Sequence, residues 1–341
     1  SAARGRLHDA FRNNQLHSEL LDRVVVMAGD IEHEHFGLTA EQYEQLTAEV
    51  DTIYHCAADI RYVKPYSVMK KPNVEGTRRI LELAYAGRPK TLQYASTAGV
   101  FGSTAALLGI DYVDEGYDID LSANIVGLEN GYTKSKWVAE RIVRLASERG
   151  LRSAIHRLGF ISGSARTGIG NNADLLCRLI CGCIQMGIYP NFPHKYWYIT
   201  PVDYAAKAMA HISLTGGTGP YHIVVTKDHD IGHNHLFETV NALGYPLKPC
   251  SGDEWFEALA SCPPDNHLYA MSSFLLEKIH EGRNTIIEVH HTSQTIDSGR
   301  VNEALRGSGI EMPKVDQAII AKYLAYFAAS GLIGPPVGGQ T

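Results

Sequence analysis

The sequence has no block of basic residues and no long apolar run. Its net charge is -6, from 31 Lys and Arg against 37 Asp and Glu, so no basic patch is indicated that would attract nucleic acid or anionic lipid. No stretch of about 18 uncharged apolar residues could span a bilayer, and the first residues do not resemble a signal peptide. With 45% apolar residues, the chain can bury a large core, and we expect a soluble globular protein with no nucleic-acid or membrane partner.

Cysteine is also scarce. The six cysteines in 341 residues are too few for a disulfide scaffold, which indicates a reducing compartment, and we expect the cytoplasm. Cys177, Cys181 and Cys183 do not have the spacing of a tetrahedral zinc site, so we expect them to pack in the core. Three histidine pairs have no carboxylate or cysteine at ligand spacing: His33 with His35, His233 with His235, and His290 with His291. We therefore predict solvated histidines and no bound metal.

The sequence does contain a tyrosine followed four residues later by a lysine. Tyr132 and Lys136 open a long amphipathic run that continues to about Gly150, and on a helix two residues four apart share one face. An ammonium held close to a phenol favours the phenolate, so we expect Lys136 to lower the pKa of Tyr132 and make it a usable general acid. Taken alone, the same spacing also fits a solvated helix face.

Strand-like and helical segments alternate through the first half of the chain. Thr39 and Gln42 have the form of a capping box. The predicted strands cover 23–31, 52–58, 91–102 and 153–163, and the predicted helices cover 6–21, 39–50, 72–86 and 131–150. This alternation indicates a parallel sheet covered by helices, whose ligands bind outside the carboxyl edge of the strands.

The motifs at these strand ends resemble the extended short-chain dehydrogenase/reductase superfamily. Ser96-Thr97-x-x-Val100-Phe101-Gly102 ends the third strand, and Tyr-x-x-x-Lys follows after an insert. The resemblance implies that Thr97 is the catalytic hydroxyl, Tyr132 the acid and Lys136 the catalytic lysine. It also implies a Rossmann-like, doubly wound parallel sheet with a smaller, mostly helical C-terminal lobe on the substrate side.

The resemblance further implies a nicotinamide cofactor along the carboxyl edge. Asp30 and Ile31 would meet its adenine, and Asn73 belongs to the helix behind the site. The preference for NADPH is inherited from the family, with Arg6 as the only remnant of the arginines that read a 2′-phosphate. Beside Tyr132 and Lys136, the implied cofactor contacts are Arg6, Asp30, Ile31, Ala57, Ala58, Asn73, Leu158, Gly159 and Ile161.

Later motifs narrow the resemblance. Arg157-Leu158-Gly159-x-Ile161-x-Gly163, Asn172-x-Asp174 before a predicted helix, and Pro201-Val202-Asp203-Tyr204 resemble the thioester reductase domains that end nonribosomal peptide and polyketide assembly lines. Carboxylic acid reductases and aminoadipate reductases carry similar domains, and the resemblance covers essentially the whole chain. The substrate contacts that we predict are Val63, Asn172, Asp174 and Pro201.

This family implies a reaction, a partner and a domain organisation. NADPH would reduce an acyl or peptidyl thioester, held on the phosphopantetheine of a carrier protein, to an aldehyde, and a second hydride could give an alcohol. We expect one monomeric domain of a larger multidomain synthetase. Residues 1–163 with about 199–230 would bind the cofactor, and 164–198 with about 231–335 would form the substrate lobe.

One motif of the superfamily does not occur, the Gly-x-x-Gly-x-x-Gly turn of the first βαβ unit. Glycine-rich turns at 167–170 and 216–219 follow the catalytic motifs and cannot replace it. We expect the turn and the first two strands to precede Arg4 in the natural polypeptide. In the strand order 3-2-1-4-5-6, these two would separate the strands at 23–31 and 52–58, leaving a gap of about 14 Å.

Three alternatives to thioester reduction stay open. Related assembly-line domains release products by Dieckmann cyclisation without redox chemistry, although they typically depart from the Thr97, Tyr132 and Lys136 set. Sugar-nucleotide epimerases and hydroxysteroid-type dehydrogenases share the strand-end motifs. A non-catalytic dinucleotide sensor or carrier-docking module would share the fold alone. A hydrolytic thioesterase is disfavoured, because no Gly-x-Ser-x-Gly nucleophile elbow occurs.

We predict that residues 1–341 alone bind a dinucleotide poorly. The pyrophosphate of a dinucleotide normally rests on the glycine-rich turn and on the helix N-terminus that follows it. Calorimetric titration of the purified chain with NADPH should therefore show no micromolar affinity, and an affinity in that range would contradict the expectation.

Overall fold

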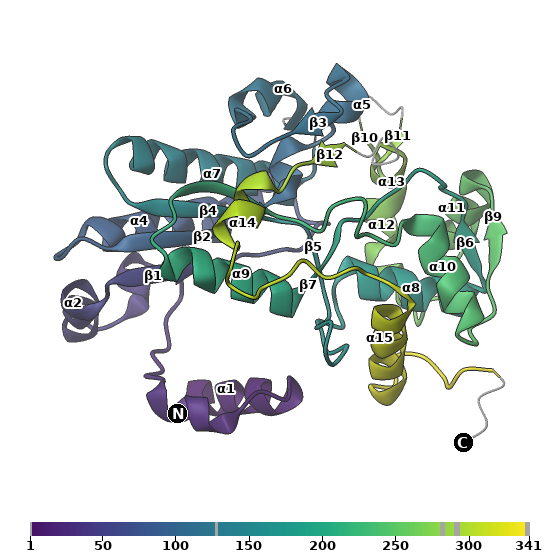
Figure 1. Ribbon diagram of the computed structural model, residues 1–341, viewed down its shortest axis with the longest axis horizontal. Helices are drawn as coiled ribbons and strands as arrows, with labels where there is room; N and C mark the ends of the chain where they lie inside the picture. The colour runs from purple at the N-terminus through teal and green to yellow at the C-terminus, as the bar shows by residue number, and fades with distance from the viewer. Residues whose placement is uncertain (1, 127–128, 280–283, 290–293, 338–341) are drawn as a thin grey trace.

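The centre of the molecule is a parallel sheet with helices on both faces (Figure 1). The computed structural model describes residues 2–126, 129–279, 284–289 and 294–337. The sheet has the order β1-β2-β4-β8, and these strands span Thr52–His55, Thr91–Thr97, Ser153–Leu158 and Gly219–Ile223. All neighbouring strands pair in parallel, which confirms the predicted Rossmann-like α/β class.

One face of the sheet is covered by α4 (Gly76–Tyr85) and α7 (Gly131–Glu148). The residues of α7 that face the sheet recur at helical spacing, as Ala139, Val143 and Ala146 do, and all three are buried. Full burial of a valine side chain contributes about 1.5–3 kcal/mol, and each buried carbon group of an alanine about 0.8 kcal/mol. This packing, rather than local helix propensity, therefore holds α7 against the sheet.

The opposite face is covered by α9 (Val202–Leu214) and α14 (Gly299–Ala304). Successive residues of a strand point to opposite faces, and in β4 Ile155 packs under α7 whereas Ala154 packs against α9. Every residue of β4 except the last is buried. Both faces of this strand are thus covered, although it carries the polar residues Ser153, His156 and Arg157.

The second half of the chain builds a mostly helical lobe beyond the carboxyl end of the sheet (Figure 1). Its hydrophobic cluster includes the fully buried Trp255, Phe237 and Leu268. Its helices are α8 (Leu175–Met186), α10 (His233–Ala242), α11 (Gly252–Ala260), α12 (Ser272–Leu276) and α15 (Gln317–Ala329). None of the described helices has the length and apolar character needed to cross a bilayer.

Short elements complete the described structure. The two-stranded pairs are β3 (Tyr112–Val113) with β12 (Thr295–Ile296), β5 (Phe160–Ser162) with β7 (Ile199–Pro201), β6 (Ile188–Pro190) with β9 (Lys248–Cys250), and β10 (Lys278–Ile279) with β11 (Asn284–Thr285). The remaining helices include α2 (Ala40–Glu49), α3 (Tyr66–Met69), α5 (Thr104–Leu108), α6 (Ala123–Val126) and α13 (Ile286–Val289).

Two predicted helix starts are confirmed. Thr39 caps α2 in a capping box, because its hydroxyl accepts the Gln42 amide at 3.3 Å and the Gln42 side chain accepts the Thr39 amide at 3.1 Å. Asp174 caps α8 by accepting the Cys177 amide at 2.7 Å. A side-chain cap of this kind contributes about 1 kcal/mol.

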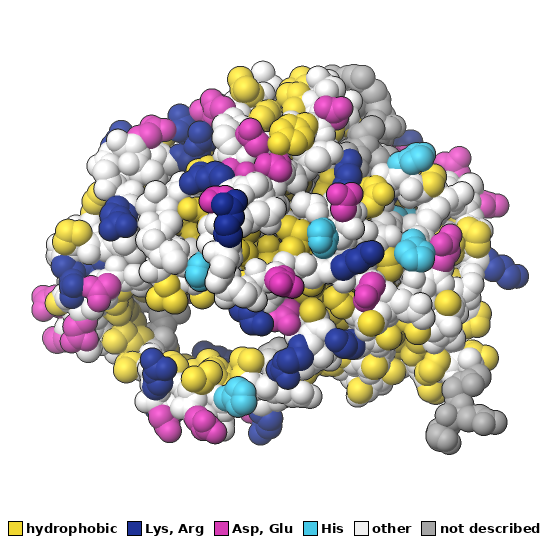
Figure 2. All heavy atoms as spheres, viewed as in Figure 1, with side chains coloured by type: hydrophobic (Ala, Val, Ile, Leu, Met, Phe, Trp, Pro, Cys, Tyr) yellow, Lys and Arg dark blue, Asp and Glu magenta, His cyan; other side chains and the backbone are white. Residues whose placement is uncertain are grey.

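The amino-terminal segment departs from the prediction. The helix expected over 6–21 is α1 (Ala2–Asn13) followed by a 3-10 helix at Ser18–Arg23, and the strand expected over 23–31 is not formed. A strand needs hydrogen bonds to a neighbour, and among the described strands β1 pairs only with β2. Val25 is 82% exposed, and α1 buries no residue and stands off from the sheet across an opening (Figure 2).

Other elements differ in their limits. The strands predicted over 52–58 and 91–102 end at His55 and Thr97. The helix predicted to begin at Pro72 begins earlier, because a π-helical turn joins α3 to α4. The strand predicted over 153–163 is divided at Gly159 into β4 and β5. A Cβ at Gly159 would lie 2.5 Å from the Thr200 hydroxyl oxygen, so two segments approach there more closely than a side chain allows.

Gly131 is a second close approach, between α7 and the loop before α3. A Cβ at Gly131 would lie 2.3 Å from the carbonyl oxygen of Lys64 and 2.6 Å from backbone atoms of Pro65 and Tyr66. Gly131→Ala should therefore lower the free energy of unfolding by about 1–3 kcal/mol. Urea unfolding measures the change.

The matched control is Gly5→Ala, in the exposed helix α1, where an added Cβ meets nothing within 4 Å. This change should be neutral or slightly stabilising. Equal stability of the two alanine variants would contradict the expected clash at Gly131.

Candidate active site

The predicted catalytic residues come together at the carboxyl end of β2. Thr97 is the last residue of β2, Tyr132 is the second residue of α7, and Lys136 follows one turn later. Helix α7 begins at this point because the Asn130 side chain accepts the Thr133 amide at 3.0 Å and caps it. The fold thus brings a hydroxyl, a phenol and an amine to one place.

The electrostatic surroundings of Tyr132 differ from those predicted. Burial raises the pKa of Tyr132 above its usual range, the neighbouring Tyr62 phenol raises it further, and the nearby Thr97 hydroxyl opposes the rise. Lys136 is not among the groups that shift this pKa. The predicted lowering of the Tyr132 pKa by Lys136 is therefore wrong for this structure, because the amine is directed elsewhere.

Lys136 lies buried between α7 and the sheet. Its Nζ donates a hydrogen bond to the Ala95 carbonyl oxygen at 2.7 Å and lies 4.2 Å from the centroid of the Tyr94 ring. Burial lowers the pKa of Lys136 to about 7, and Glu140 and Cys56 oppose that shift. Both the neutral and the charged form of this amine are consequently populated near neutral pH.

A buried charge network lies one helical turn behind Lys136. Glu140 accepts hydrogen bonds from Arg157 Nε at 3.0 Å and Nη2 at 2.7 Å, and from the Ser96 hydroxyl. Arg157 Nη1 lies 3.1 Å from His222 Nε2. This network was not predicted from the sequence, although the four-residue step from Lys136 to Glu140 on the buried face of α7 is a usable signal.

Asn73 ties the loop after β1 to α7. Its Oδ1 accepts the Asp59 amide at 2.7 Å, and its Nδ2 donates to the Asp59 carbonyl at 2.9 Å and to the Ser135 hydroxyl oxygen at 2.8 Å. Ser135 in turn donates to the Tyr132 carbonyl at 2.8 Å. Asn73 therefore braces the backbone that carries the predicted acid, and its contact with a cofactor stays a prediction.

Some of the other predicted cofactor contacts lie at the same sheet edge. Ala57 and Ala58 are exposed directly after β1. Leu158 ends β4 opposite Thr97. Gly159 donates its amide to the Ile223 carbonyl at 3.0 Å.

The remaining predicted cofactor residues occupy different positions. Ile161 lies in β5. Ile31 packs against the start of α4, where a Cβ on Gly76 would lie 2.7 Å from its Cγ1. The Asp30 carboxylate accepts the amide of Glu32, two residues later. Arg6 is exposed on α1, which buries none of its residues, so no packing directs it toward the Thr97 edge.

The four predicted substrate contacts lie on three different segments: the loop after β1, the residues that precede α8, and β7. Val63 is 44% exposed in the loop after β1, and Pro201 is buried at the end of β7. Burial raises the pKa of the Asp174 carboxyl to about 6. The Asn172 side-chain oxygen is buried without a hydrogen-bond partner among the described residues. Their contact with a substrate stays a prediction.

Two aromatic residues near the site were not predicted from the sequence: Tyr62, which contacts Tyr132, and Phe274, which contacts Tyr62. The Tyr62 ring lies edge-to-face with the Tyr132 ring, with centroids 5.2 Å apart, and is stacked on Phe274 with centroids 5.1 Å apart. Tyr62 precedes the predicted contact Val63, but Phe274 lies more than two hundred positions further along the chain. No local pattern could have indicated that these rings meet.

The cysteines and histidines that we considered as metal ligands occupy both buried and exposed positions. Cys177, Cys181 and Cys183 are buried in the lobe cluster, as predicted. His233 is buried, with Nε2 2.8 Å from the Pro190 carbonyl oxygen, so its predicted solvation is wrong, whereas His33 and His235 have exposed side chains. His290 and His291 lie outside the described residues. Among the described residues no three His, Cys, Asp or Glu side chains converge on a metal position.

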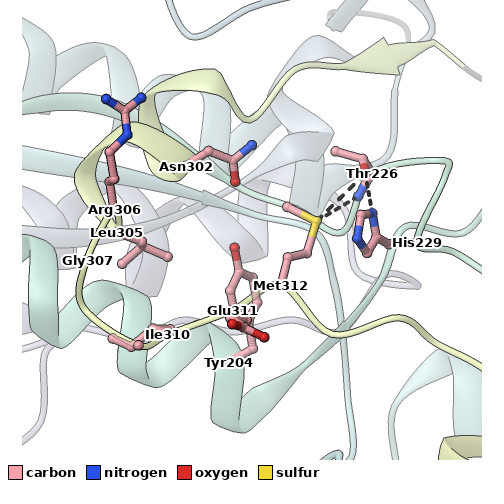
Figure 3. Close-up of a pocket in the computed structure, with 11 residues that line it drawn as sticks. Tyr204, Thr226, His229, Asn302, Leu305, Arg306, Gly307, Ile310, Glu311 and Met312 are labelled. Carbon is pink, nitrogen blue, oxygen red and sulfur yellow. Dashed lines mark hydrogen bonds between the residues drawn. The ribbon is translucent and has the colours of Figure 1, made fainter.

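A cavity of about 620 Å³ lies between α9, α14 and the segment after α14 (Figure 3). Tyr204 and Met312 line it, together with His229, which lies 3.1 Å from the Thr226 hydroxyl. No predicted catalytic, cofactor or substrate residue contributes to its wall. The cavity is therefore separate from the Thr97, Tyr132 and Lys136 site.

Comparisons with known proteins match this architecture. The family profile described as male sterility protein, an NAD-binding family, matches residues 1–209. The chain is 34% identical over 318 residues to the non-canonical nonribosomal peptide synthetase FrzA of a Cladobotryum species, covering 91% of this chain and 31% of that protein. It is 30% identical over 322 residues to the nonribosomal peptide synthetase asaC of Aspergillus flavus, covering 92% of this chain and 31% of that protein.

Among solved structures, the terminal R domain of the myxalamid PKS-NRPS pathway superposes with a TM-score of 0.86 at 32% identity, covering 98% of this chain and 82% of that one. The sheet and these matches place the chain in a class of oxidoreductases that use a nicotinamide cofactor. The chain belongs to the thioester reductase (R) domain family of the extended short-chain dehydrogenases/reductases. It spans less than a third of the length of the two curated relatives.

The buried amine of Lys136 should limit stability at low pH. Its pKa is about 7 when folded and 10.5 in the absence of burial, so the unfolded chain binds more protons between these values and stability rises with pH across that window. Lys136→Met should therefore stabilise the protein by about 1–2 kcal/mol at pH 6. Thermal unfolding at pH 6 and pH 9 measures the effect, which should shrink at the higher pH.

Lys195 offers a matched control. It is equally buried, its Nζ donates to the Ile287 carbonyl at 3.2 Å, and burial lowers its pKa to about 7. Lys195→Met should stabilise with the same pH dependence but leave reductase activity intact, whereas Lys136→Met should abolish activity. Destabilisation by Lys136→Met at pH 6 would contradict the assigned pKa direction.

Proposed function

We propose that this protein uses NADPH to reduce an acyl or peptidyl thioester, held on the phosphopantetheine of a carrier protein, to an aldehyde. The observation that carries the proposal is the convergence of the Thr97 hydroxyl and the Tyr132 phenol at the carboxyl edge, with Lys136 one turn behind. Two adjacent hydroxyl donors can bind the oxygen of one carbonyl and stabilise the negative charge that develops there.

The donor set also fits the nicotinamide end of a dinucleotide. The Tyr132 hydroxyl would bind one ribose hydroxyl, and the Lys136 amine, which gives one hydrogen to the Ala95 carbonyl, keeps further hydrogens for another. Ala57 and Ala58 are exposed at the same edge of the sheet. Bound NADPH supplies the hydride. Family resemblance, and not a contact of Arg6, supports NADPH over NADH.

Each residue then has a defined task in the proposed reaction. Tyr132, whose pKa stays high, remains protonated at neutral pH and donates its proton to the carbonyl oxygen of the thioester. Thr97 donates a second hydrogen bond to the same oxygen. Collapse of the resulting hemithioacetal breaks the carbon–sulfur bond, which releases the aldehyde and returns the thiol to the carrier.

A carrier-protein partner and a larger synthetase are part of the proposal. Both curated relatives named above are much longer than their match to this chain, and their names describe peptide synthetases. The substrate would therefore arrive on a neighbouring carrier domain. The acyl group, and whether a second reduction gives an alcohol, would follow from the upstream domains.

Tyr132→Phe tests the proposed acid. The change removes the proton donor and keeps the ring, so NADPH oxidation with a pantetheine thioester should fall by about a hundredfold or more. The assay uses the longest native polypeptide that contains residues 1–341. Tyr85→Phe is the matched control, because Tyr85 is half exposed at the end of α4 and its hydroxyl donates to the Ala146 carbonyl.

Product analysis separates the proposal from its rivals. Mass spectrometry should identify an aldehyde as the product. One molecule of NADPH should be oxidised to NADP for each thioester consumed. Unchanged turnover in Tyr132→Phe would refute the assignment of the acid. A cyclised product formed without NADPH consumption would favour Dieckmann release, and turnover of a sugar nucleotide in place of the thioester would favour an epimerase.

A further inference from the structure

A row of three aromatic rings links the lobe to the predicted acid. Phe274 of α12 stacks on Tyr62 with an interplanar angle of 26°, and Tyr62 meets Tyr132 at 70°. Aromatic pairs prefer these stacked and edge-to-face arrangements, because the positive ring edge is attracted to the negative face. The Tyr62 ring therefore restrains the orientation of the Tyr132 ring.

The loop that carries Tyr62 is held against α7 on both sides of this residue. Before it, Asp59 is bound through its amide and carbonyl by Asn73, which also bonds Ser135 of α7. After it, the backbone of residues 64–66 lies directly against Gly131. The distance between the two tyrosines is therefore set by contacts that anchor the loop on both sides of Tyr62.

The lobe side of the row is equally constrained. Phe274 is buried in the large lobe cluster, and Tyr62 packs against that cluster from the sheet side. No hydrogen bond of the Tyr62 hydroxyl occurs within the described part of the chain, and the neighbouring charged group is Asp174. The ring of Tyr62, rather than its hydroxyl, thus makes the contacts with Tyr132 and Phe274.

We propose that Tyr62 is a positioning residue that holds the Tyr132 ring so that its phenol meets Thr97 at the reacting carbonyl, with Phe274 supporting Tyr62 from the lobe. The inference rests on the proposed function, in which Tyr132 is the proton donor. Misplacement of a catalytic group by about 1 Å can cost up to about a hundredfold in rate. Removal of the Tyr62 ring should accordingly act on the chemical step and not on substrate binding.

The first experiment compares two substitutions in the longest native polypeptide that contains residues 1–341, assayed with NADPH and a pantetheine thioester. Tyr62→Leu should lower kcat about 10- to 100-fold and leave both KM values within about twofold. Tyr62→Phe keeps the ring, so its kcat should stay close to the wild-type value. An unchanged kcat in Tyr62→Leu, a change in KM alone, or equal losses in both variants would overturn the proposal.

A double-mutant cycle then tests whether Tyr62 acts through Tyr132. In the Tyr132→Phe background no phenol remains to be positioned, so Tyr62→Leu should lower the residual rate by less than about twofold. A full independent loss in that background would overturn the positioning role. If Tyr132→Phe alone leaves the rate unchanged, the proposed function fails; if only the Tyr62 variants do so, the positioning role alone fails.

Tyr189→Leu is the control for a purely structural effect. Tyr189 stacks on Phe237 in the lobe core with centroids 5.0 Å apart, an arrangement similar to that of Tyr62 on Phe274. Its loss should lower the melting temperature without changing kcat. A fall in kcat for Tyr189→Leu as large as that for Tyr62→Leu would show a general effect of lobe packing and overturn the specific role of Tyr62.

Discussion

The buried ion pair between Glu140 and Arg157 sets the geometry on which the site depends. It joins α7 to β4, and the Ser96 hydroxyl adds β2 to the same network. Tyr132, Lys136 and Glu140 are spaced four residues apart and share one face of α7, so the bonds that hold Glu140 to β2 and β4 also fix the rotation of the helix. Breaking such a buried pair by removing one partner typically costs about 3–5 kcal/mol, because the other charge remains desolvated.

The same burial explains the contrasting charges of the site. Glu140 and Arg157 compensate each other, whereas Lys136 has a backbone carbonyl and the face of Tyr94 as its immediate neighbours. Desolvation therefore lowers the pKa of Lys136 and raises that of Tyr132. The two groups do not form a phenolate and ammonium pair, and the tyrosine keeps the proton that the proposed chemistry requires.

Contacts between the two halves of the molecule have a similar influence. The loop after β1 meets α7 at Gly131 and meets the lobe through Tyr62 and Phe274. Tyr62 thereby contacts the Tyr132 ring directly, and Phe274 contacts Tyr62 from the lobe. The charge of Asp174, the N-cap of α8, raises the pKa of Tyr62. A further element of the lobe therefore lies on the same side of the site.

The sequence by itself determined the fold class, the alternation of strands and helices and the residues that gather at the end of β2. These depend on local signals: apolar periodicity, the caps at Thr39 and Asp174, and the short motifs around Thr97 and Tyr132. Tertiary structure decided whether the segment at 23–31 becomes a strand, because strand formation needs a neighbouring strand as hydrogen-bond partner.

Tertiary structure also decided the direction of the Tyr132 pKa shift and the identity of the neighbours Tyr62, Phe274 and Arg157. Helical spacing predicts which side chains share a face, but desolvation and ring contacts depend on residues brought in from other parts of the chain. Spacing could therefore place Lys136 near Tyr132 without revealing that its amine turns to the Ala95 carbonyl. The chemistry of the site is set by packing between elements, and local sequence patterns carry no record of that packing.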